Sequence, residues 1–261
     1  MASKFKYGEK ESKHTERAYL APEIVRQRMR TLEVLKPNVG ESILDVGCGP
    51  GLLAQDLAIE VDPEGKVVGI DTSASMLELA ERRCADLPQV EFVEADAKSL
   101  AADDATYDAA VCVQVLLYVE DPNQVLKEIH RVLKPGGRIV IMETDWRGMV
   151  LNNRDQVLTD KMAAAWDRKV PSPNLPARLG PLLRQQGFAA TSVEAFPILS
   201  TSYKREGFSG GMLAQFASLA RKDGTVSEAD SRAWVEDLKR LGAEDAYFFC
   251  INRFLFSAVK I

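Results

Sequence analysis

The chain has 261 residues, of which 46% are hydrophobic and 27% charged, so it is long enough to bury a full core. No run approaches the ~18 consecutive apolar residues of a membrane helix, and we expect no membrane insertion. A net charge of −5 argues against a broad nucleic-acid surface, which makes a small molecule the expected partner.

The N-terminus and the cysteines indicate the compartment. The opening stretch MASKFKYGEKESKHTER is charged and lacks the apolar segment of a signal peptide, which predicts a cytoplasmic protein. The cysteines Cys48, Cys84, Cys112 and Cys250 lie far apart, with no C-x-x-C pair and no clustered histidines. We therefore expect neither a disulfide framework nor a metal site.

Helix-like and strand-like segments alternate from residue 22 onward. The first predicted helix places Ile24, Arg28, Leu32 and Leu35 on one face. Five predicted strands follow at residues 42–46, 66–70, 90–93, 108–113 and 138–142, and the helices between them begin near residues 52, 73 and 122. This alternation is typical of an α/β fold with a parallel sheet covered on both faces.

The last third of the chain is less regular. Its predicted helices lie around residues 155–169, 179–186, 211–221 and 227–241. A strand is expected near residues 190–196, and another in the closing stretch FFCINRFLFSAVKI. Ser227 and Asp230 have the spacing of a capping box at the start of the last helix.

Three glycines, Gly47, Gly49 and Gly51, directly follow the first predicted strand. Such a cluster marks a sharp turn or a close approach of the backbone to a ligand. A dinucleotide fingerprint, G-x-G-x-x-G, would need a glycine where Leu52 stands. A nicotinamide or flavin nucleotide is therefore the second choice of ligand, and Asp45, just before the glycines, suits a cationic ligand better than a pyrophosphate.

Polar side chains follow the other predicted strands as well. In open α/β sheets, ligands bind beyond the carboxyl ends of the strands. The residues at these ends are Asp45, Asp71, Asp96, Gln114, Glu143 and Asp145. They are the candidate site residues.

The stretches ILDVGCGPG, VVGIDTSASML, EADAKSL and HRVLKPGGRIVI resemble, in their order and spacing, the successive motifs of class I S-adenosylmethionine-dependent methyltransferases. The resemblance covers about residues 22–143 and looks closest to the small-molecule branch that includes ubiquinone and menaquinone biosynthesis enzymes. It implies a Rossmann-like, seven-stranded sheet made of five parallel βα units and a C-terminal strand pair, with helical insertions forming a cap.

The same resemblance implies S-adenosylmethionine as the cofactor and a small-molecule acceptor such as a quinol, phenol or amine, methylated by in-line displacement in a monomer or homodimer. It also implies four segments. They are an N-terminal helical lid (1–36), a cofactor-binding core (37–145), a helical substrate-pocket segment (146–187) and a C-terminal strand pair (188–261) with a helical insertion (204–244).

The resemblance assigns a cofactor-binding role to each candidate residue. On the methionyl side, Gly47, Gly49 and Gly51 allow the protein backbone to approach the methionyl part of the cofactor. Asp45 lies near the ammonium group and Gln114 near the sulfonium. Tyr19 and Arg28 are candidates for binding the carboxylate. On the nucleoside side, Asp71, with Thr72 beside it, accepts from the ribose hydroxyls, Met76 borders the adenine, and Asp96 and Ala97 bind its edge.

A general base is required only if the nucleophile carries a proton that must leave. The candidates for this catalytic role are Glu143 and Asp145 at the end of the fifth strand and His14 near the N-terminus. We expect the acceptor pocket to be lined from among the apolar residues Trp146, Met149, Phe208, Met212 and Phe216.

Alternatives remain open at this stage. Asp45 could instead cap a helix or bond to backbone amides, and Met76 and Gln114 could serve packing alone. For the whole chain, the alternatives are an NAD-dependent oxidoreductase and a noncatalytic partner protein that binds S-adenosylmethionine. Methylation of nucleic-acid base amines is not expected. The fourth strand ends in QVLL and not in the D/N-P-P-aromatic motif of the nucleic-acid amino-methyltransferases that the chain otherwise resembles.

Overall fold

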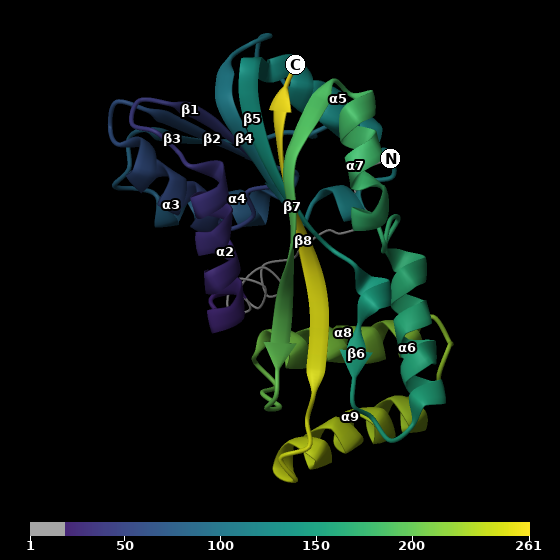
Figure 1. The fold of residues 1–261 in the computed structure, drawn as a ribbon. Helices are drawn as coiled ribbons and strands as arrows, with labels where there is room; N and C mark the ends of the chain where they lie inside the picture. The colour runs from purple at the N-terminus through teal and green to yellow at the C-terminus, as the bar shows by residue number, and fades with distance from the viewer. Residues whose placement is uncertain (1–18) are drawn as a thin grey trace.

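A computed structural model describes residues 19–261 as an α/β fold built on one sheet (Figure 1). The strands run in the order β3-β2-β1-β4-β5-β8-β6, and β7 pairs with β8. Their bounds are β1 (Ser42–Val46), β2 (Lys66–Asp71), β3 (Val90–Glu94), β4 (Tyr107–Val113), β5 (Leu133–Thr144), β6 (Val150–Leu151), β7 (Phe188–Ser200) and β8 (Phe249–Lys260). The pairs among β1 to β5 are parallel, and every pair made by β8 is antiparallel.

Helices connect these strands and cover the sheet. They are α2 (Pro22–Leu35), α3 (Leu52–Val61), α4 (Ala74–Arg83), α5 (Pro122–Val132), α6 (Gln156–Lys169), α7 (Pro176–Gln185), α8 (Phe208–Lys222) and α9 (Glu228–Ala243), with short 3-10 turns η1 (Leu116–Tyr118) and η2 (Trp146–Gly148). None of the helices in residues 19–261 is long and apolar enough to cross a bilayer.

The α/β class and the five parallel strands are confirmed. Strand β7 is longer than predicted, and β5 begins at Leu133 rather than at residue 138, because the chain is already extended there and Leu133 pairs with Tyr107. The short β6 adds an eighth strand to the seven that were predicted. It pairs with Phe249 and Cys250, the part of β8 that lies beyond β5.

The core has two layers because both faces of the parallel strands are buried. In β1, the fully buried Ile43 packs with α3 residues such as Leu57, whereas Leu44 packs on the opposite face with α5 residues such as Ile129. Alternation of side chains along a strand produces this division.

The predicted face of α2 was partly wrong. Its buried side chains are Ile24, Gln27, Thr31 and Leu35, and Arg28 and Leu32 are half-buried. Apolar spacing could not locate this face, since two of its four members are polar. Gln27 and Thr31 face the pocket described below.

The β7–β8 pair extends past the sheet and supports a cap of helices. Pairing between β5 and β8 stops at Thr144 and Arg253, whereas β7 and β8 stay paired as far as Ser200 and Phe249. The helices α6, α8 and α9 gather around this extension, in the lower part of Figure 1. The cap therefore lies beyond the carboxyl end of β5.

Aromatic packing and a helix cap stabilise this extension. The rings of Trp166 and Phe216 stack with centroids 5.0 Å apart, and Trp146 packs on both. At the start of α9, the Ser227 hydroxyl accepts from the Asp230 amide at 3.0 Å, as the capping box predicts. The Asp230 carboxylate accepts from the Ser227 hydroxyl.

A pair of glycine substitutions tests how tightly α4 packs on the glycine turn. Gly51 and Gly224 have similar left-handed φ angles of +77° and +75°, but a Cβ on Gly51 would lie 2.8 Å from the Ala80 Cβ, whereas nothing lies within 4 Å at Gly224. Gly224→Ala should cost about 1 kcal/mol for the backbone strain alone. Gly51→Ala should cost about 1–3 kcal/mol more through the clash, measured by urea unfolding. Equal losses would show that α4 yields freely.

Candidate cofactor site

A pocket with an empty volume of about 590 Å³ opens at the carboxyl ends of β1 and β4. Its walls come from five parts of the chain: α2 with Tyr19 before it, the end of β1, the glycine turn with the start of α3, the end of β4, and one residue of β8. Among the predicted residues, the lining includes Tyr19, Arg28, Asp45, Gly47, Gly49 and Gln114. The structure therefore brings the methionyl-side candidates together, apart from Gly51.

A glycine is required at each of the three positions of the turn for a different physical reason. All have positive φ angles, of +71°, +53° and +77°. A Cβ on Gly47 would overlap the Val115 side chain, and one on Gly51 would overlap Ala80, so these two make room for protein atoms. A Cβ on Gly49 would meet only Tyr19, at 3.8 Å. Gly49 is thus the glycine that leaves space on the pocket side.

Asp45 is a buried carboxyl group in the pocket wall. It is 2% exposed, and its Oδ2 has no hydrogen-bond partner among residues 19–261. Burial, assisted by the charge of Asp71, raises the pKa of Asp45 to about 7. An unpaired carboxylate in such a place fits a cationic group of a ligand, because pairing offsets its lost hydration.

Asp71 lies at the end of β2 and holds the glycine turn. Its Oδ2 accepts from the Gly49 amide at 3.0 Å, and its Oδ1 accepts from the Ser73 amide at 2.9 Å. Burial raises the pKa of Asp71, against the opposing effect of these amides. Of its neighbours, Thr72 is exposed and Met76 is buried in α4.

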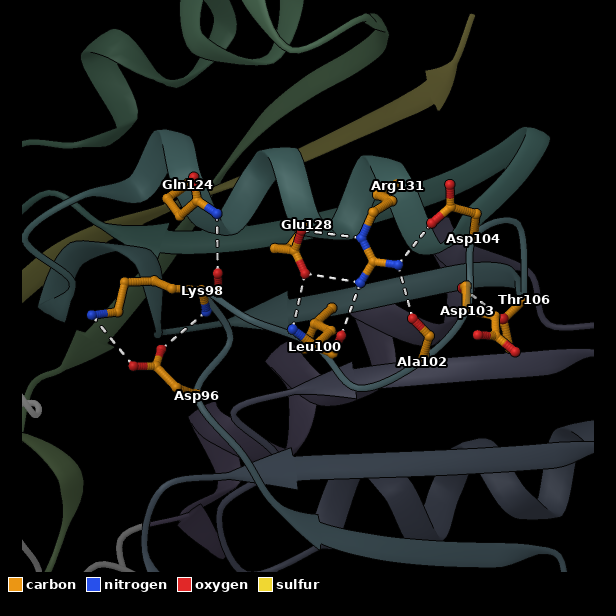
Figure 2. Close-up of polar contacts among 10 residues, drawn as sticks. All are labelled: Asp96, Lys98, Leu100, Ala102, Asp103, Asp104, Thr106, Gln124, Glu128 and Arg131. Carbon is orange, nitrogen blue, oxygen red and sulfur yellow. Dashed lines mark hydrogen bonds and ion pairs between the residues drawn. The ribbon is translucent and has the colours of Figure 1, made fainter.

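The predicted adenine segment after β3 is tied to α5 (Figure 2). Asp96 is exposed, its Oδ1 accepts from the Lys98 amide at 3.0 Å, and its Oδ2 pairs with the Lys98 Nζ at 3.3 Å. Ala97 is half-buried. From α5, Gln124 donates to the Lys98 carbonyl at 3.1 Å. The helix therefore positions the segment that carries Asp96 and Ala97.

Arg131 of α5 makes the larger part of this connection. Its guanidinium donates to the carbonyls of Leu100, at 2.9 Å, and Ala102, at 2.8 Å, and pairs with the carboxylates of Asp104 and Glu128 (Figure 2). Hydrogen bonds from a charged donor are among the stronger ones in proteins. Arg131, together with Gln124 and Glu128, thus holds the loop between β3 and β4.

Gln114, at the end of β4, has an unusual backbone conformation with φ of +59°. Its Nε2 donates to the Met142 carbonyl at 3.1 Å, and its Oε1 accepts from the Thr144 hydroxyl at 2.5 Å. Thr144 in turn accepts from the Arg253 Nε at 3.1 Å. This buried network fixes the Gln114 side chain against β5 and β8.

Arg28 and Tyr19 lie on the α2 side of the pocket. The Arg28 Nε pairs with the Asp56 carboxylate of α3 at 2.5 Å. Burial raises the pKa of the Tyr19 hydroxyl, and the charge of Arg253 opposes this. Arg28 is thus already neutralised by a protein carboxylate.

Two of the candidate bases, Glu143 and Asp145, are not part of the pocket lining. Glu143 is fully buried, its Oε1 accepts from the amides of Val115 (3.1 Å) and Leu116 (2.7 Å), and burial raises its pKa to about 8. Asp145 is half-buried and accepts from the Arg147 amide at 3.3 Å, capping η2. His14 lies outside the described residues.

Sequence reasoning missed Arg253, together with its contacts Gln27 and Thr144. The signal was present in the last strand, where Phe249, Ile251, Arg253 and Leu255 alternate toward the buried side. A single charged residue on an otherwise apolar strand face indicates a special role. Among residues 19–261, no group of three or more His, Cys, Asp or Glu side chains could hold a metal ion.

One known family matches part of the chain. Residues 44–141 match a family described as a methyltransferase domain. The matched residues are less than half of the chain. They include the glycine turn, Asp71, Asp96 and Gln114, which stands at the end of β4.

Two curated relatives are similar to this chain over part of their length. A demethylmenaquinone methyltransferase of Clavibacter sepedonicus is 40% identical over 150 residues, which are 58% of this chain and 60% of that protein. An uncharacterised 37.1 kDa protein from a Streptomyces fradiae transposon is 40% identical over 163 residues, or 62% of this chain and 47% of that protein. The chain thus spans about half the length of the curated relatives it matches.

The solved structure of a protein named as the [4+2]-cyclase SpnF is similar over 90% of this chain and 80% of that chain, with 25% identity and a TM-score of 0.59. This similarity extends over the segments on both sides of residues 44–141. A similar fold thus occurs in a protein that is named for a reaction other than methyl transfer.

The buried Asp45 predicts how the stability of the ligand-free protein depends on pH. In the unfolded chain this carboxyl loses its proton near pH 4, whereas the folded state retains it to about pH 7. The folded state therefore binds more protons between these values, and this group lowers stability as the pH rises. Asp45→Asn removes the effect.

We expect Asp45→Asn to be more stable than the natural protein by about 1–4 kcal/mol at pH 8, and by much less at pH 5, in urea unfolding without ligand. The exposed Asp86→Asn serves as the matched control and should change little at either pH. A gain of the same size at both pH values would contradict the assignment.

Arg131→Ala tests whether α5 positions the adenine segment. It should lower stability by about 1–3 kcal/mol, through loss of the charged hydrogen bonds, and weaken S-adenosylhomocysteine binding by roughly 3- to 10-fold in calorimetry. The control is Arg232→Ala, which removes an ion pair with Glu228 in which the arginine is 73% exposed. It should cost less than about 0.5 kcal/mol and leave binding unchanged. Unchanged binding in Arg131→Ala would show that the segment is held by other contacts.

Proposed function

We propose that this chain transfers the methyl group of S-adenosylmethionine to a small-molecule acceptor by in-line displacement. The observation that carries the proposal is the pocket beside Gly49, in which the carboxylate of Asp45 is buried without a partner. The match of residues 44–141 to a methyltransferase domain supports it. The residues present fit this cofactor, which carries an ammonium group and a sulfonium.

The protein's own residues would bind and orient the reactants. We assign Asp45 to the cofactor ammonium group, and Gly47 and Gly49 to the close approach of the backbone to the methionyl part. Asp71, with Thr72, is assigned to the ribose. Met76, Asp96 and Ala97 are assigned to the adenine. When bound, S-adenosylmethionine supplies an activated methyl group on a positively charged sulfur. Gln114, fixed by its bond to Thr144, is assigned to the wall near that sulfur. Gly51 remains a proposed cofactor residue, although the position that a Cβ would occupy on it faces Ala80.

Catalysis of this kind depends mainly on alignment and the exclusion of water. The cap supports both, because its aromatic cluster of Trp146, Trp166 and Phe216 is buried next to the end of β5. We also propose that the chain is divided into four segments. They are a lid (1–36), a core (37–145), a substrate-pocket segment (146–187) and a C-terminal strand pair (188–261).

The proton acceptor, where the acceptor molecule needs one, is proposed among Glu143, Asp145 and His14. Glu143 has a pKa of about 8, which is in the range useful for proton transfer near neutral pH. Its Oε2 is buried without a partner among residues 19–261. Its Oε1 accepts hydrogen bonds from the amides of Val115 and Leu116, the two residues that directly follow Gln114 in the chain.

Quinols are the first acceptor class to test, because relatives 36–40% identical to parts of this chain are named demethylmenaquinone methyltransferases. Phenols, amines and thiols follow. A cytoplasmic location and a monomer or homodimer are part of the same proposal, and rest on the sequence alone. The second candidate is a noncatalytic partner protein that binds S-adenosylmethionine. The likeness to a protein named as a cyclase supports testing it, because that name states a reaction other than methyl transfer.

The deciding experiment is calorimetric titration with S-adenosylmethionine and S-adenosylhomocysteine. We expect micromolar binding by the natural protein and a loss of roughly 100-fold or more in Asp71→Ala, because the ribose loses a charged acceptor. The exposed Asp86→Ala is the control and should bind normally. A radiolabelled-methyl screen of quinols, phenols, amines and thiols then tests transfer.

Each result has a distinct meaning. Binding by a nicotinamide nucleotide, and not by either adenosyl ligand, would replace the proposal with an oxidoreductase. Tight binding of S-adenosylmethionine with no methylated product from any acceptor class would favour the noncatalytic alternative.

A further inference from the structure

Arg253 is a buried cation that the cofactor assignments above leave without a role. It lies on β8, opposite Thr144 at the end of β5, and is 3% exposed. Burial lowers its pKa to about 10, so it stays protonated at neutral pH. A buried charge is costly unless a partner of opposite charge compensates for its lost hydration.

The protein supplies Arg253 with neutral partners. The Nε donates to the Thr144 hydroxyl at 3.1 Å, and the Nη1 donates to the Gln27 amide oxygen. The guanidinium also lies over the Phe208 ring, 5.0 Å from its centroid. Among residues 19–261, no carboxylate lies within ion-pair distance of Arg253. Tyr19, Tyr118, Glu143 and Glu23 favour the cation without forming an ion pair with it.

The same pocket holds the buried acid Asp45, whose Oδ2 also lacks a partner among residues 19–261. Asp45 and Arg253 both line it, and they do not pair with each other. A ligand end that carries an ammonium group and a carboxylate close together would satisfy both. The methionyl end of the proposed cofactor is such a zwitterion, so this argument rests on the function proposed above.

We infer that Arg253 binds the cofactor carboxylate, so that Asp45 and Arg253 together recognise the amino-acid end of S-adenosylmethionine. Arg28, the candidate from the sequence, is engaged by Asp56 instead and holds α2 against α3. The assignment makes Arg253 a specificity residue: it selects ligands that carry the carboxylate and disfavours adenosyl thioethers that lack it.

The hydrogen-bond network gives this residue a second consequence. Arg253 donates to Thr144, and Thr144 donates to Gln114, which stands at the end of β4 in the same pocket. Occupation of Arg253 by a carboxylate therefore restrains, through two hydrogen bonds, the side chain assigned to the sulfonium end. Recognition of one end of the cofactor is structurally connected to the other end.

A ligand-and-mutant cycle tests the inference through binding alone. The ligands are S-adenosylhomocysteine and its decarboxylated analogue, and the proteins are the natural chain, Arg253→Gln and Arg28→Gln, all measured by calorimetry. We expect Arg253→Gln to weaken S-adenosylhomocysteine roughly 10- to 100-fold and to change the affinity for the analogue less than about 3-fold, since only the first ligand offers a charged partner. Arg28→Gln should affect both ligands to the same extent.

Two further measurements keep the test valid if Arg253→Gln fails to fold. Arg253→Lys retains the charge without the planar fork and should still discriminate between the ligands, at reduced affinity for S-adenosylhomocysteine. In the natural protein alone, the analogue should bind at least about 10-fold more weakly than S-adenosylhomocysteine.

Equal affinities for the two ligands in the natural protein would overturn the inference. So would a selective loss of affinity for S-adenosylhomocysteine in Arg28→Gln and not in Arg253→Gln. Failure of the natural protein to bind S-adenosylhomocysteine at all would instead remove the proposed function. The two failures are thus distinguishable.

Discussion

The parallel pairing of β1, β2, β4 and β5 is the constraint on which the rest of the structure depends. Parallel neighbours require a crossover connection, so every one of these strands ends at the same edge of the sheet. Residues far apart in the chain, such as Asp45, Asp71, Gln114 and Glu143, are collected at that edge as a result. The antiparallel β8 then brings Arg253 to the same edge from the other end of the chain.

Buried ionisable groups are the second feature that organises the site. Asp45, Glu143 and Arg253 are each at most 3% exposed, yet no ion pair joins any of them to another described residue. Glu143 accepts hydrogen bonds from backbone amides, whereas Asp45 and Arg253 face the pocket. A pocket whose walls hold unpaired ionisable groups is less stable when empty and gains from a ligand that pairs them. Stability and ligand binding are therefore linked at this edge.

The two ends of the site are held in different ways. The proposed methionyl side is built from buried groups on β1, β4, β5 and β8, whereas the loop that carries Asp96 is tied to α5 by the half-buried Arg131. Ion pairs and carbonyl contacts at the surface are weaker and more sensitive to salt than buried ones. The proposed nucleoside side is thus the more adjustable part of the site.

The sequence by itself determined the α/β class, the position of the glycine turn and the carboxylates at the strand ends, because these depend on local periodicity, on glycine geometry and on the rule that parallel strands end together. It also predicted the capping box of α9. Only the tertiary structure decided that Gly51 packs against Ala80, that Arg28 pairs with Asp56, and that Arg253 meets Thr144. Such contacts join residues separated by long stretches of chain, and their partners are set by strand register and helix packing, which no local pattern specifies.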